Sequence, residues 1–328
     1  MSRATIHVVA GVLRDGSGRV LIAQRPAQSH QGGRWEFPGG KLEPAEQPVD
    51  GLRRELHEEL GIALQASRPL IQVEHDYGDR HVLLDVHLVL SYRGEPRGCE
   101  GQPLAWSPVD ALDPDQFPPA DRPVISALKL PSLCLITPQD APDATDPAQE
   151  PRMARFLACF ERATDAGAML VQLRAHDLSD SGFAALARAA APIFQACAIP
   201  LVLNRSPEVI APLLHQQLAQ GMHLSAARLH QLSARPLTGQ GLVGASCHTA
   251  EDLAHAGELQ LDYALLSPVQ PTRSHPGAQA LGWDGFARLV RPARLPVYAL
   301  GGLTADDVHR AWAYGAQGVA AIRGLWPC

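Results

Sequence analysis

Apolar positions in the first third of the chain form short strand-like runs and one helical stripe. Residues 5–13 (TIHVVAGVL) and 19–25 (RVLIAQR) are rich in β-branched and aliphatic side chains, and the DGSG between them is a hairpin signal. Residues 47–60 instead carry apolar side chains at helical spacing, at Val49, Leu52, Leu56 and Leu60. The pattern predicts a hairpin followed by an amphipathic helix.

The ends of this helix carry the residues that are typical of such positions. Pro48 lies near the start and Gly61 just past the end, where proline and glycine are each favoured. A mostly buried strand is predicted over 81–90 and a second helix over 121–129. Together these elements predict a compact α+β domain over residues 1–130.

The rhythm changes after this domain, where short apolar runs alternate with stretches of helical potential. The runs cover residues 133–136, 168–173, 200–203, 221–224, 242–246, 263–267, 296–300 and 318–322. Eight strands that alternate with helices predict a (β/α)8 TIM barrel over residues 131–328. The segment 138–151 has the composition of a linker, but we place it after the first barrel strand, because LCLI (133–136) already fits that strand.

Composition places the chain among globular proteins with more than one domain. A length of 328 residues exceeds what one hydrophobic core normally supports. No apolar run approaches the ~18 residues of a membrane span, and the N-terminus lacks the features of a signal peptide, so we expect a cytoplasmic protein with no membrane partner. The net charge of −6 argues against binding to a nucleic acid polymer.

The cysteines and lysines are distributed unevenly. Six cysteines occur without a CxxC pair, at Cys99, Cys134, Cys159, Cys197, Cys247 and Cys328. We expect these residues to be thiols in a reducing compartment rather than a disulfide or zinc framework. Lys41 and Lys129 are the only lysines, so every fixed positive charge after residue 129 belongs to arginine.

Acidic residues gather on the predicted amphipathic helix. At about 100° per residue, Glu55, Glu58 and Glu59 fall within one ~100° arc, where their charges repel one another. The structural alternative is a solvated acidic face. A divalent cation such as Mg²⁺ would remove the repulsion, and the tight turn that Gly39-Gly40 permits could direct a backbone carbonyl at the same ion.

The spacing of these residues resembles a known family signature. Gly40, five residues, Glu46, seven residues and then RELHEELGI (54–62) match the Nudix box at every position. The likeness extends to the MutT type, the 8-oxo-dGTP hydrolases, through AQRPAQSHQGGRWEFPGGK before the box and CEGQPLAW and FPPADRPVI after it. The resemblance implies a Nudix fold, a mixed sheet sandwiched by helices.

The resemblance also implies site residues. Mg²⁺, or Mn²⁺ in its place, would be held by the Gly39 carbonyl, Glu55, Glu58, Glu59 and Glu100. The nucleoside triphosphate would be contacted by Arg25, His30, Glu36, Phe37, Pro38, Gly39, Arg80 and Asp121. The implied reaction yields a nucleoside monophosphate and pyrophosphate, with metal-activated water as nucleophile.

Two details of this chemistry are specific to the chain. Spacing does not distinguish a general base from a metal ligand, and we favour Glu55 over Glu58 as the base. Asp121 stands where the bacterial MutT pattern has Asn, at the position expected to contact the purine edge. An amide both donates and accepts, whereas an ionised carboxylate only accepts, which weakens the expectation of strict 8-oxo discrimination.

Residues 133–328 resemble, in order, the landmarks of the thiamine-phosphate synthase and thiazole tautomerase superfamily. The quoted runs are LCLIT, VQLR, LVLN, MHLS, VGASCHT, YALLSPVQPTRS and ALGG. Arg174 and the turn Gly301-Gly302 are implied to bind phosphate, the glycines by close backbone approach before a helix capped by Thr304. His248, in a Ser-x-His spacing that suits the tautomerase branch, is a candidate general acid or base.

The same region departs from the synthase pattern where positive charge and metal binding are expected. Two lysines are replaced in the neighbourhood of Ala175-His176 and Ser274-His275, and the Asp of an Asn-Asp-Arg triplet is missing after Asn204. The Gln and Asp after the HLG motif are replaced in SAAR (225–228). These departures argue against full synthase activity.

Three functional hypotheses follow from the sequence. The first is an 8-oxo-dGTP hydrolase joined to a degenerate barrel. The second is hydrolysis of pyrophosphates of the thiamine pathway, with a tautomerase-like barrel. The third makes the barrel a module that only binds a phosphorylated ligand of the thiamine pathway.

Overall fold

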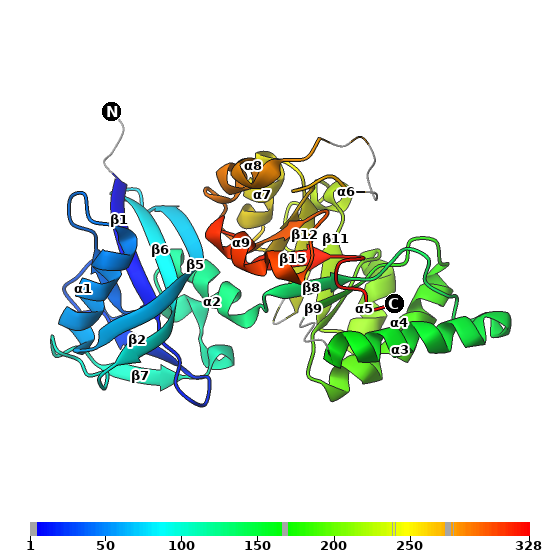
Figure 1. Cartoon of the computed structure of the whole chain (residues 1–328), viewed down its shortest axis with the longest axis horizontal. Helices are drawn as coiled ribbons and strands as arrows, with labels where there is room; N and C mark the ends of the chain where they lie inside the picture. Colours follow the sequence, from blue (N-terminus) through cyan, green and yellow to red (C-terminus); the bar gives the residue numbers. More distant parts are fainter. Residues whose placement is uncertain (1–4, 166–169, 238, 240, 273–276, 278) are drawn as a thin grey trace. The chain divides into compact units, whose positions relative to one another are not determined.

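The computed structural model describes residues 5–165, 170–237, 239, 241–272, 277 and 279–328, and it divides into two compact units. The first unit ends at Lys129 and also includes Arg291–Pro296. The second comprises Leu130–Val290 and Val297–Cys328. Figure 1 colours both units along the chain.

The first unit contains a mixed sheet and a smaller antiparallel sheet. The mixed sheet has the order β4-β1-β6-β5, formed by β4 (Gly39–Lys41), β1 (Thr5–Val12), β6 (His81–Arg93) and β5 (Ala63–Asp76). Only β1 and β6 pair in parallel. The smaller sheet has the order β3-β2-β7, formed by β3 (Trp35–Glu36), β2 (Val20–Gln24) and β7 (Leu104–Ser107).

The predicted DGSG turn is present, but the strands that it joins do not form the expected hairpin. The carboxylate of Asp15 accepts hydrogen bonds from the backbone N–H groups of Ser17 and Arg19, which closes the turn. Arg14 and Val20 form a single antiparallel bridge. Beyond it the prediction was wrong, since β1 and β2 diverge into separate sheets and enclose a core between them.

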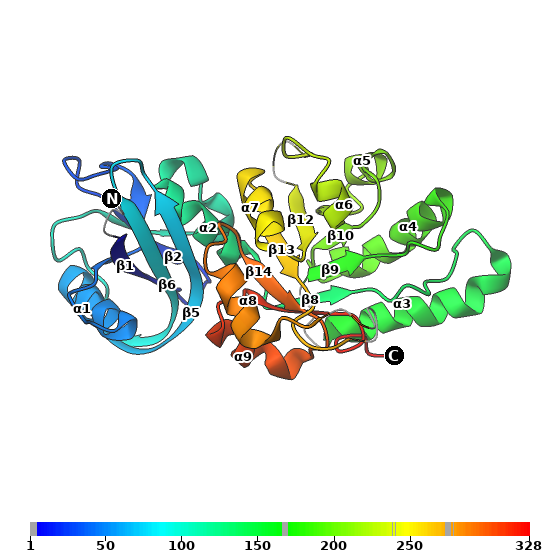
Figure 2. The same ribbon diagram turned by 90° about the horizontal axis from the view of Figure 1, so that it is seen from above.

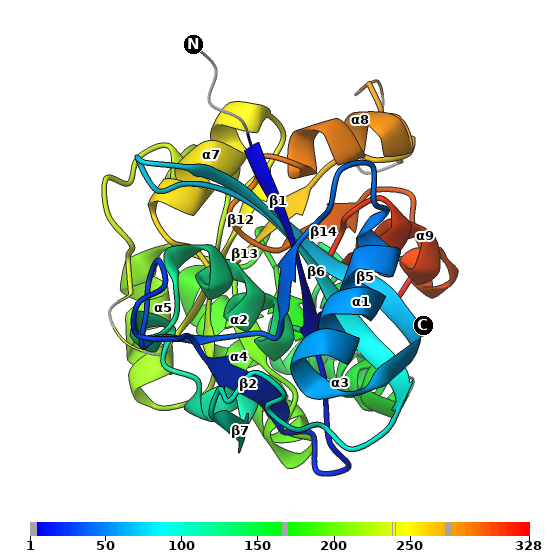
Figure 3. The same ribbon diagram turned by 90° about the vertical axis from the view of Figure 1, so that its left-hand side faces the viewer.

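The helix α1 (Pro48–Leu60) begins and ends at the predicted residues. Gly61 adopts a left-handed φ of 68°, and its N–H returns to the carbonyl of His57. Leu52, Leu56 and Leu60 are fully buried, and α1 lies across the face of the mixed sheet (Figure 3). Val49 was wrongly assigned to this face: it is exposed, because the first turn of the helix precedes its packing on the sheet.

The remaining elements of the first unit close its second core. The helix α2 (Arg122–Lys129) confirms the prediction for 121–129, and its Val124, Ile125 and Leu128 are buried against the sheet strands. Three 3₁₀ turns lead into it, namely η1 (Val109–Ala111), η2 (Pro114–Gln116) and η3 (Pro119–Asp121).

The second unit is a closed barrel of eight parallel strands in the ring order β10-β11-β12-β13-β14-β15-β8-β9, which confirms the TIM-barrel prediction (Figures 1 and 2). The strands are β8 (Leu133–Ile136), β9 (Leu170–Leu173), β10 (Leu201–Leu203), β11 (Gly221–Leu224), β12 (Leu242–Cys247), β13 (Tyr263–Leu266), β14 (Val297–Leu300) and β15 (Gly318–Ala321). All eight predicted runs therefore form strands, and residues 168 and 169 of the second run lie outside the described residues.

Helices surround the ring of strands, as Figure 2 shows. They are α3 (Glu150–Asp165), α4 (Asp180–Ala196), α5 (Pro207–His215), α6 (Ala226–Leu229), α7 (Ala250–Glu258), α8 (Gly282–Val290) and α9 (Val308–Ala313), with 3₁₀ turns η4 (Pro147–Gln149) and η5 (Ala305–Asp307). The segment 138–149 joins β8 to α3, as we placed it, because β8 closes the ring between β15 and β9.

The interior of the barrel is filled by side chains that point inward from the strands. Tyr263 and Tyr298 are fully buried and pack edge to face, with ring centroids 5.9 Å apart. Gly244 on the neighbouring strand makes this possible, because a Cβ there would lie 2.0 Å from the Tyr263 ring. The phenol of Tyr298 donates to the carbonyl of Pro131 over 2.6 Å.

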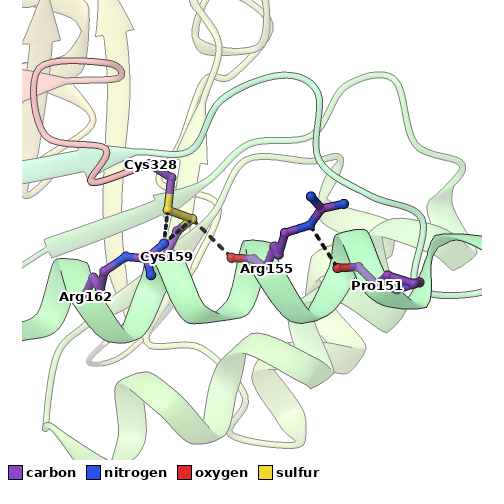
Figure 4. The surroundings of a disulfide bond; sticks show 5 residues. All are labelled: Pro151, Arg155, Cys159, Arg162 and Cys328. Atoms are coloured by element: carbon purple, nitrogen blue, oxygen red, sulfur yellow. Dashed lines mark hydrogen bonds between the residues drawn. A yellow bond between two sulfur atoms is a disulfide. The ribbon is translucent and has the colours of Figure 1, made fainter.

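Two of the cysteines form a disulfide, which contradicts our expectation of thiols only. Cys159 on α3 is bonded to Cys328, with Cα atoms 6.0 Å apart (Figure 4). The two residues are separated by 169 positions, so no local spacing announces the pair. The other four, Cys99, Cys134, Cys197 and Cys247, are free thiols as predicted.

No helix in the described part of the chain is long and apolar enough to cross a membrane.

Candidate functional sites

Arg54 organises the acidic residues of α1. Its guanidinium donates to Glu46 over 2.9 and 3.0 Å, to Glu55 over 2.9 Å and to Glu58 over 3.1 Å. It also donates to the carbonyl of Lys41. These contacts raise the pKa of Arg54, with the Glu46 hydrogen bonds as the largest cause. One cation thus holds three carboxylates in place and joins α1 to the turn before it.

Two glycines let the carboxylates of α1 touch the preceding strand. The backbone N–H of Gly39 donates to Glu59 over 3.0 Å. A Cβ at Gly39 would lie 2.1 Å from the carbonyl oxygen of Val9, and one at Gly40 would lie 2.3 Å from a carboxylate oxygen of Glu55. The two glycines therefore permit a close approach that any side chain would prevent.

Glu100 reaches the same region through a loop fastened to the end of α1. The carbonyl of Glu59 accepts from the Cys99 N–H over 2.9 Å and from the Gln102 side chain over 3.1 Å. The Gln102 side chain in turn accepts from the N–H of Glu100. The loop therefore brings Glu100, which lies forty positions after the end of α1 in the sequence, to the acidic cluster.

The carboxylates of this cluster repel one another in the structure. The pKa of Glu59 is raised to about 8, chiefly by burial and also by the nearby charges of Glu36, Glu100 and Glu55, while the hydrogen bond from Gly39 opposes the shift. Burial is also the main cause of a raised pKa at Glu55, which Arg54 opposes and Glu58 and Glu100 reinforce. The carboxylates are thus close enough to repel one another, which is the condition that a bound cation relieves.

The predicted nucleotide residues line a cavity of about 120 Å³ beside this cluster. Its walls include Arg25, His30, Glu36, Phe37, Gly39, Arg80 and Asp121. Pro38 does not line it: its carbonyl accepts from Gly11 over 2.8 Å, so it anchors the loop between Phe37 and Gly39 to β1. Gly39 lies in the cavity wall and donates to Glu59, so the cavity adjoins the acidic cluster.

Arg25 orders the loop at the mouth of this cavity. Its guanidinium donates to the carbonyl of His30 over 2.9 Å and forms an ion pair with Glu36. Burial raises the pKa of Glu36, and Arg25 opposes that shift. The pair fixes one wall of the cavity, with Phe37 packed on Phe117 beneath it.

Tyr77 is a cavity residue that our sequence reasoning missed. It lies at the tip of the β5–β6 hairpin, where its N–H donates to the carbonyl of Arg80, and its ring packs edge to face on His30 at 4.9 Å. The aromatic residue in the turn YGDR was the available signal. The hairpin brings Tyr77 and Arg80 into the cavity together.

Asp121 is buried at the back of the cavity and accepts a hydrogen bond from the N–H of Phe37. Its pKa is raised to about 8, chiefly by burial and further by the charge of Glu36, while Arg25 opposes the shift. That Asp121 weakens 8-oxo discrimination stays a prediction. In its protonated form the group donates through its O–H and accepts through its carbonyl, as an asparagine amide does.

In the second unit, the carboxyl ends of the barrel strands surround a pocket of about 570 Å³. Arg174, His248, Gly301 and Gly302, which we singled out from the sequence, all line it. Thr137 holds the end of β9, because its hydroxyl donates to the Arg174 carbonyl and accepts from the Arg174 N–H. Ser274 and His275 lie outside the described residues.

The glycine turn of the pocket differs in one respect from its predicted setting. Gly301 and Gly302 have φ of 110° and 70°, and a Cβ at Gly302 would lie 2.8 Å from the carbonyl oxygen of Pro271. Thr304 caps η5 as expected, but its N–H donates to the carboxylate of Asp307. The helix end is therefore satisfied internally, and the glycine backbone is what the turn offers to a ligand.

A buried hydrogen-bond chain leads to the pocket wall and was not predicted. His223 is fully buried on β11, with one ring nitrogen 2.9 Å from the hydroxyl of Ser246 and the other 3.2 Å from the hydroxyl of Tyr263. Burial, reinforced by the charge of Arg174, lowers the pKa of His223 to about 3, so the ring is neutral. Ser246 lines the pocket. The motif MHLS carried this histidine, but its partners are 23 and 40 positions away.

His248 lies beside Ser246 at the pocket wall. Its Nδ1 is 3.0 Å from the carbonyl oxygen of Ser267, an acceptor that favours the proton on Nδ1. The Nε2 atom then carries the lone pair that acid–base chemistry requires. The backbone N–H of His248 donates to Asp252, which fixes the start of α7.

Comparisons with known proteins match the two regions of the chain that carry these sites to two families. Residues 144–325, more than half of the chain, match the family model of thiamine monophosphate synthase, and residues 9–127 match that of the NUDIX domain. The chain belongs to both families.

The relatives described below each match one of the two regions of the chain. The 8-oxo-dGTP diphosphatase of Escherichia coli (strain K12) is 40% identical over 124 residues, which are 38% of this chain and 96% of that protein. The CTP pyrophosphohydrolase of the same organism is 42% identical over 37% of this chain and 90% of its own length. The thiamine-phosphate synthase of Azorhizobium caulinodans (strain ATCC 43989) is 32% identical over 52% of this chain and 79% of its own length.

The first unit is therefore a Nudix hydrolase, an enzyme that acts on nucleotides, and Nudix hydrolases generally use divalent metal ions. The described residues contain no group of three or more His, Cys, Asp or Glu already converged on one point. In this structure Arg54 and the Gly39 N–H hold the carboxylate oxygens instead. The donor set nevertheless fits a divalent cation, because it consists of carboxylate oxygens whose mutual repulsion is otherwise unrelieved.

Proposed function

We propose that the Nudix unit hydrolyses an oxidised purine nucleoside triphosphate, 8-oxo-dGTP foremost, to the monophosphate and pyrophosphate in a Mg²⁺-dependent reaction. The observation that carries the proposal is that Gly39 lines the cavity that holds the buried Asp121 and also donates to Glu59 of the acidic cluster. A nucleotide with its base at Asp121 would then direct its phosphates toward the carboxylates.

The acidic cluster supplies the metal ligands in this proposal. The carbonyl of Gly39, Glu55, Glu58, Glu59 and Glu100 would hold Mg²⁺, or Mn²⁺ in its place. A bound divalent ion neutralises phosphate charge and lowers the pKa of an attacking water. Arg54 donates to Glu55 and Glu58 and would hold both carboxylates in place for the ion.

Glu55 is our choice for the general base. Its carboxylate is partly buried against Gly40, and burial raises its pKa, which strengthens it as a proton acceptor. Glu58 is exposed on the next turn and shares Arg54 with it, so its part is to complete the cation site. The proton of the water would move to Glu55 as the phosphate bond breaks.

Asp121 would select the base. Below its raised pKa the neutral carboxyl both donates and accepts, which suits a purine edge that presents both kinds of group. Above that pKa the carboxylate only accepts. We therefore expect the preference for 8-oxo-dGTP over dGTP to fall as pH rises through about 8, and Asp121→Asn to remove this dependence.

Two other substrate classes compete with the oxidised purine triphosphate. The similarity to a CTP pyrophosphohydrolase favours a pyrimidine triphosphate, and the synthase-like barrel favours a pyrophosphate of the thiamine pathway. Steady-state kinetics with 8-oxo-dGTP, dGTP, CTP and thiamine pyrophosphate would separate them. The highest kcat/KM is expected for 8-oxo-dGTP, and a higher value for CTP or thiamine pyrophosphate would contradict the proposal.

For the barrel we propose binding of a phosphorylated ligand, with the phosphate at Gly301-Gly302. His248 is the candidate acid or base, because its Nδ1 faces a carbonyl and its Nε2 is left for a ligand. A tautomerase-like turnover would be lost in His248→Ala. Ligand binding with no turnover in either protein would instead leave the barrel as a binding module. A cytoplasmic location for the whole enzyme is part of the same proposal.

A further inference from the structure

The disulfide between Cys159 and Cys328 joins two cysteines with very different surroundings. Cys159 is buried on α3 and only 4% exposed, whereas Cys328 lies on the surface. An incoming thiolate can therefore reach the sulfur of Cys328 and expel that of Cys159. The rate of thiol–disulfide exchange depends on such access to one sulfur, so the bond is open to attack while the barrel stays folded.

Arg162 places a positive charge beside both sulfurs of the bond. Its Nη2 lies 3.5 Å from the Sγ of Cys159 and also contacts the Sγ of Cys328 (Figure 4). During exchange each sulfur in turn carries negative charge, and a neighbouring arginine lowers the pKa of a thiol and stabilises its thiolate. The position of Arg162 therefore favours both the departure of Cys159 and the reactivity of Cys328.

The protein also provides a partner for the reduced form of Cys159. Its Sγ lies 3.1 Å from the carbonyl oxygen of Arg155, one helical turn earlier on α3. A disulfide sulfur has no proton to donate to this oxygen, whereas a thiol has one. The buried sulfur therefore gains a hydrogen bond on reduction, and the same place on α3 accommodates both redox forms.

The bond holds residues 322–328, which follow β15, against α3. Trp326 packs on Phe156 and Phe160 of α3, at ring-centroid distances of 4.9 and 5.5 Å. The N–H of Trp326 donates to the carbonyl of Ile322, which forms a turn directly after the strand. Ring packing, the turn and the disulfide thus act together on this short segment.

Opening of the bond would release this segment and leave the ring of strands closed. The strand β15 pairs with β14 and β8 through its own ladders, which do not involve the disulfide. Arg323 and Gly324 of the segment line the barrel pocket, so its release would loosen one wall of that pocket. A cytoplasmic location, as proposed above, exposes the bond to reductants, and disulfides that form in the cytosol are usually transient.

We propose that Cys159 and Cys328 form a reversible thiol–disulfide exchange site, which attaches residues 322–328 to α3 when oxidised and releases them when reduced by a dithiol. One thiolate of the dithiol attacks the Sγ of Cys328, forms a mixed disulfide and expels Cys159, whose thiolate is stabilised by Arg162 and then takes up a proton. The second sulfur of the dithiol closes on the first and expels Cys328. The dithiol is oxidised to a cyclic disulfide, and its two electrons and two protons pass to the two cysteines.

Counting thiols in the full-length protein tests the exchange. Samples are incubated with dithiothreitol under native conditions, denatured in the presence of a maleimide and analysed by mass spectrometry. We expect four labelled cysteines before reduction and all six after it, and oxidised dithiothreitol should return the count to four. A bond that resists dithiothreitol in the folded protein, or that does not re-form in oxidised dithiothreitol, would overturn the proposal.

Hydrogen exchange measures what the bond holds in place. Reduction should speed exchange of the amides of Leu325 and Trp326, in the turn after β15, by at least about tenfold, as expected for opening of a local unit. The amide of Val319, within β15, should be unaffected. Cys328→Ser should exchange like the reduced protein, with or without dithiothreitol. Unchanged exchange in the turn, or equal acceleration at Val319, would overturn a bond that holds this segment alone.

The role of Arg162 is tested by the rate of reduction. Arg162→Gln removes the charge beside the sulfurs and should slow reduction by about three- to tenfold, as expected for a higher pKa of the leaving thiol. Arg155→Gln is the matched control, because this exposed side chain donates to Pro151 and its loss leaves the carbonyl beside Cys159 in place. Melting temperatures of both variants check folding. Equal rates of reduction in the two variants would overturn the stabilisation of the thiolate by Arg162.

Discussion

The two units of this protein build their candidate sites from opposite kinds of side chain. The Nudix unit gathers carboxylates, Glu55, Glu58, Glu59 and Glu100, at the place where phosphates are expected. The barrel lines its pocket with Arg174, His176 and Arg323 and with no described acidic residue. An acidic site can hold phosphate only through a cation between them, whereas a basic site can hold it directly.

The contrast extends to the internal electrostatics of each site. In the Nudix unit, burial is the largest cause of the raised pKa of Glu59, and neighbouring negative charges add to it. In the barrel, burial is the largest cause of the lowered pKa of His176, and neighbouring positive charges add to it. The difference teaches that the two candidate sites favour partners of opposite charge, a cation beside the carboxylates and an anion beside the arginines.

Chelation gives the largest expected separation between the two units. EDTA in excess should abolish nucleotide hydrolysis, because the carboxylates cannot approach phosphate without a cation, and added Mg²⁺ or Mn²⁺ should restore it. Phenyl phosphate binding by the barrel should be unchanged in the same samples. Nucleotide hydrolysis that persists in EDTA would contradict a metal-dependent Nudix unit.

Substitution of Glu59 by glutamine should have the second largest effect on nucleotide hydrolysis. Glu59→Gln keeps a hydrogen-bond acceptor for the Gly39 N–H but removes a metal-binding charge, so kcat/KM should fall by at least about 100-fold. The control is His57→Gln, because His57 is exposed on the same helix and should not affect turnover. Steady-state kinetics with a circular-dichroism check of folding measure both. Full activity in Glu59→Gln would refute the metal assignment.

Removal of Arg54 should have a smaller effect through orientation alone. Arg54→Ala frees Glu46, Glu55 and Glu58 from a shared partner, so we expect a loss of about 10- to 100-fold that higher Mg²⁺ concentration partly rescues. Arg53→Ala, which removes an exposed pair with Asp50, is the control. A loss of activity that is equal at all Mg²⁺ concentrations would contradict an orienting role.

Over a single pH unit, the pH dependence of stability should be the smallest of these effects, and it concerns Asp121. Its pKa is raised on folding, so its contribution is fully present below the ordinary value of 3.8 and is lost as pH rises through about 8. Within this window stability should fall by up to about 1.4 kcal/mol per pH unit relative to Asp121→Asn, which does not titrate. Urea denaturation of both proteins across the window measures the difference. Parallel stability curves would show that Asp121 is ionised in the folded protein.

Local patterns were sufficient for most of the fold. Each barrel strand is a short apolar run bounded by turn residues, and α1 carries its own cap at Gly61, so both were predictable from neighbouring residues. Predictions failed where the outcome depended on distant partners. The strands on either side of DGSG enter different sheets, and Val49 is exposed although its spacing is helical.

The candidate sites show the same division. The positions of the acidic residues on α1 followed from helical geometry, and Glu100 and Asp121 were assigned only through resemblance to a family. The chain from Tyr263 through His223 to Ser246 was not predictable, because its members come from three strands. Tyr77 was missed for the same reason, since only the packing of its hairpin on His30 brings it to the cavity.

The sequence by itself determined the two folds, the helical arc of carboxylates and the replacement of lysine by arginine throughout the barrel, because each of these is a property of residue type and short-range spacing. Tertiary structure alone decided the raised pKa of Asp121, the disulfide between Cys159 and Cys328, and the absence of acidic residues from the described lining of the barrel pocket. These properties depend on burial and on which distant groups come within a few ångströms, and neither quantity is defined until the chain has folded.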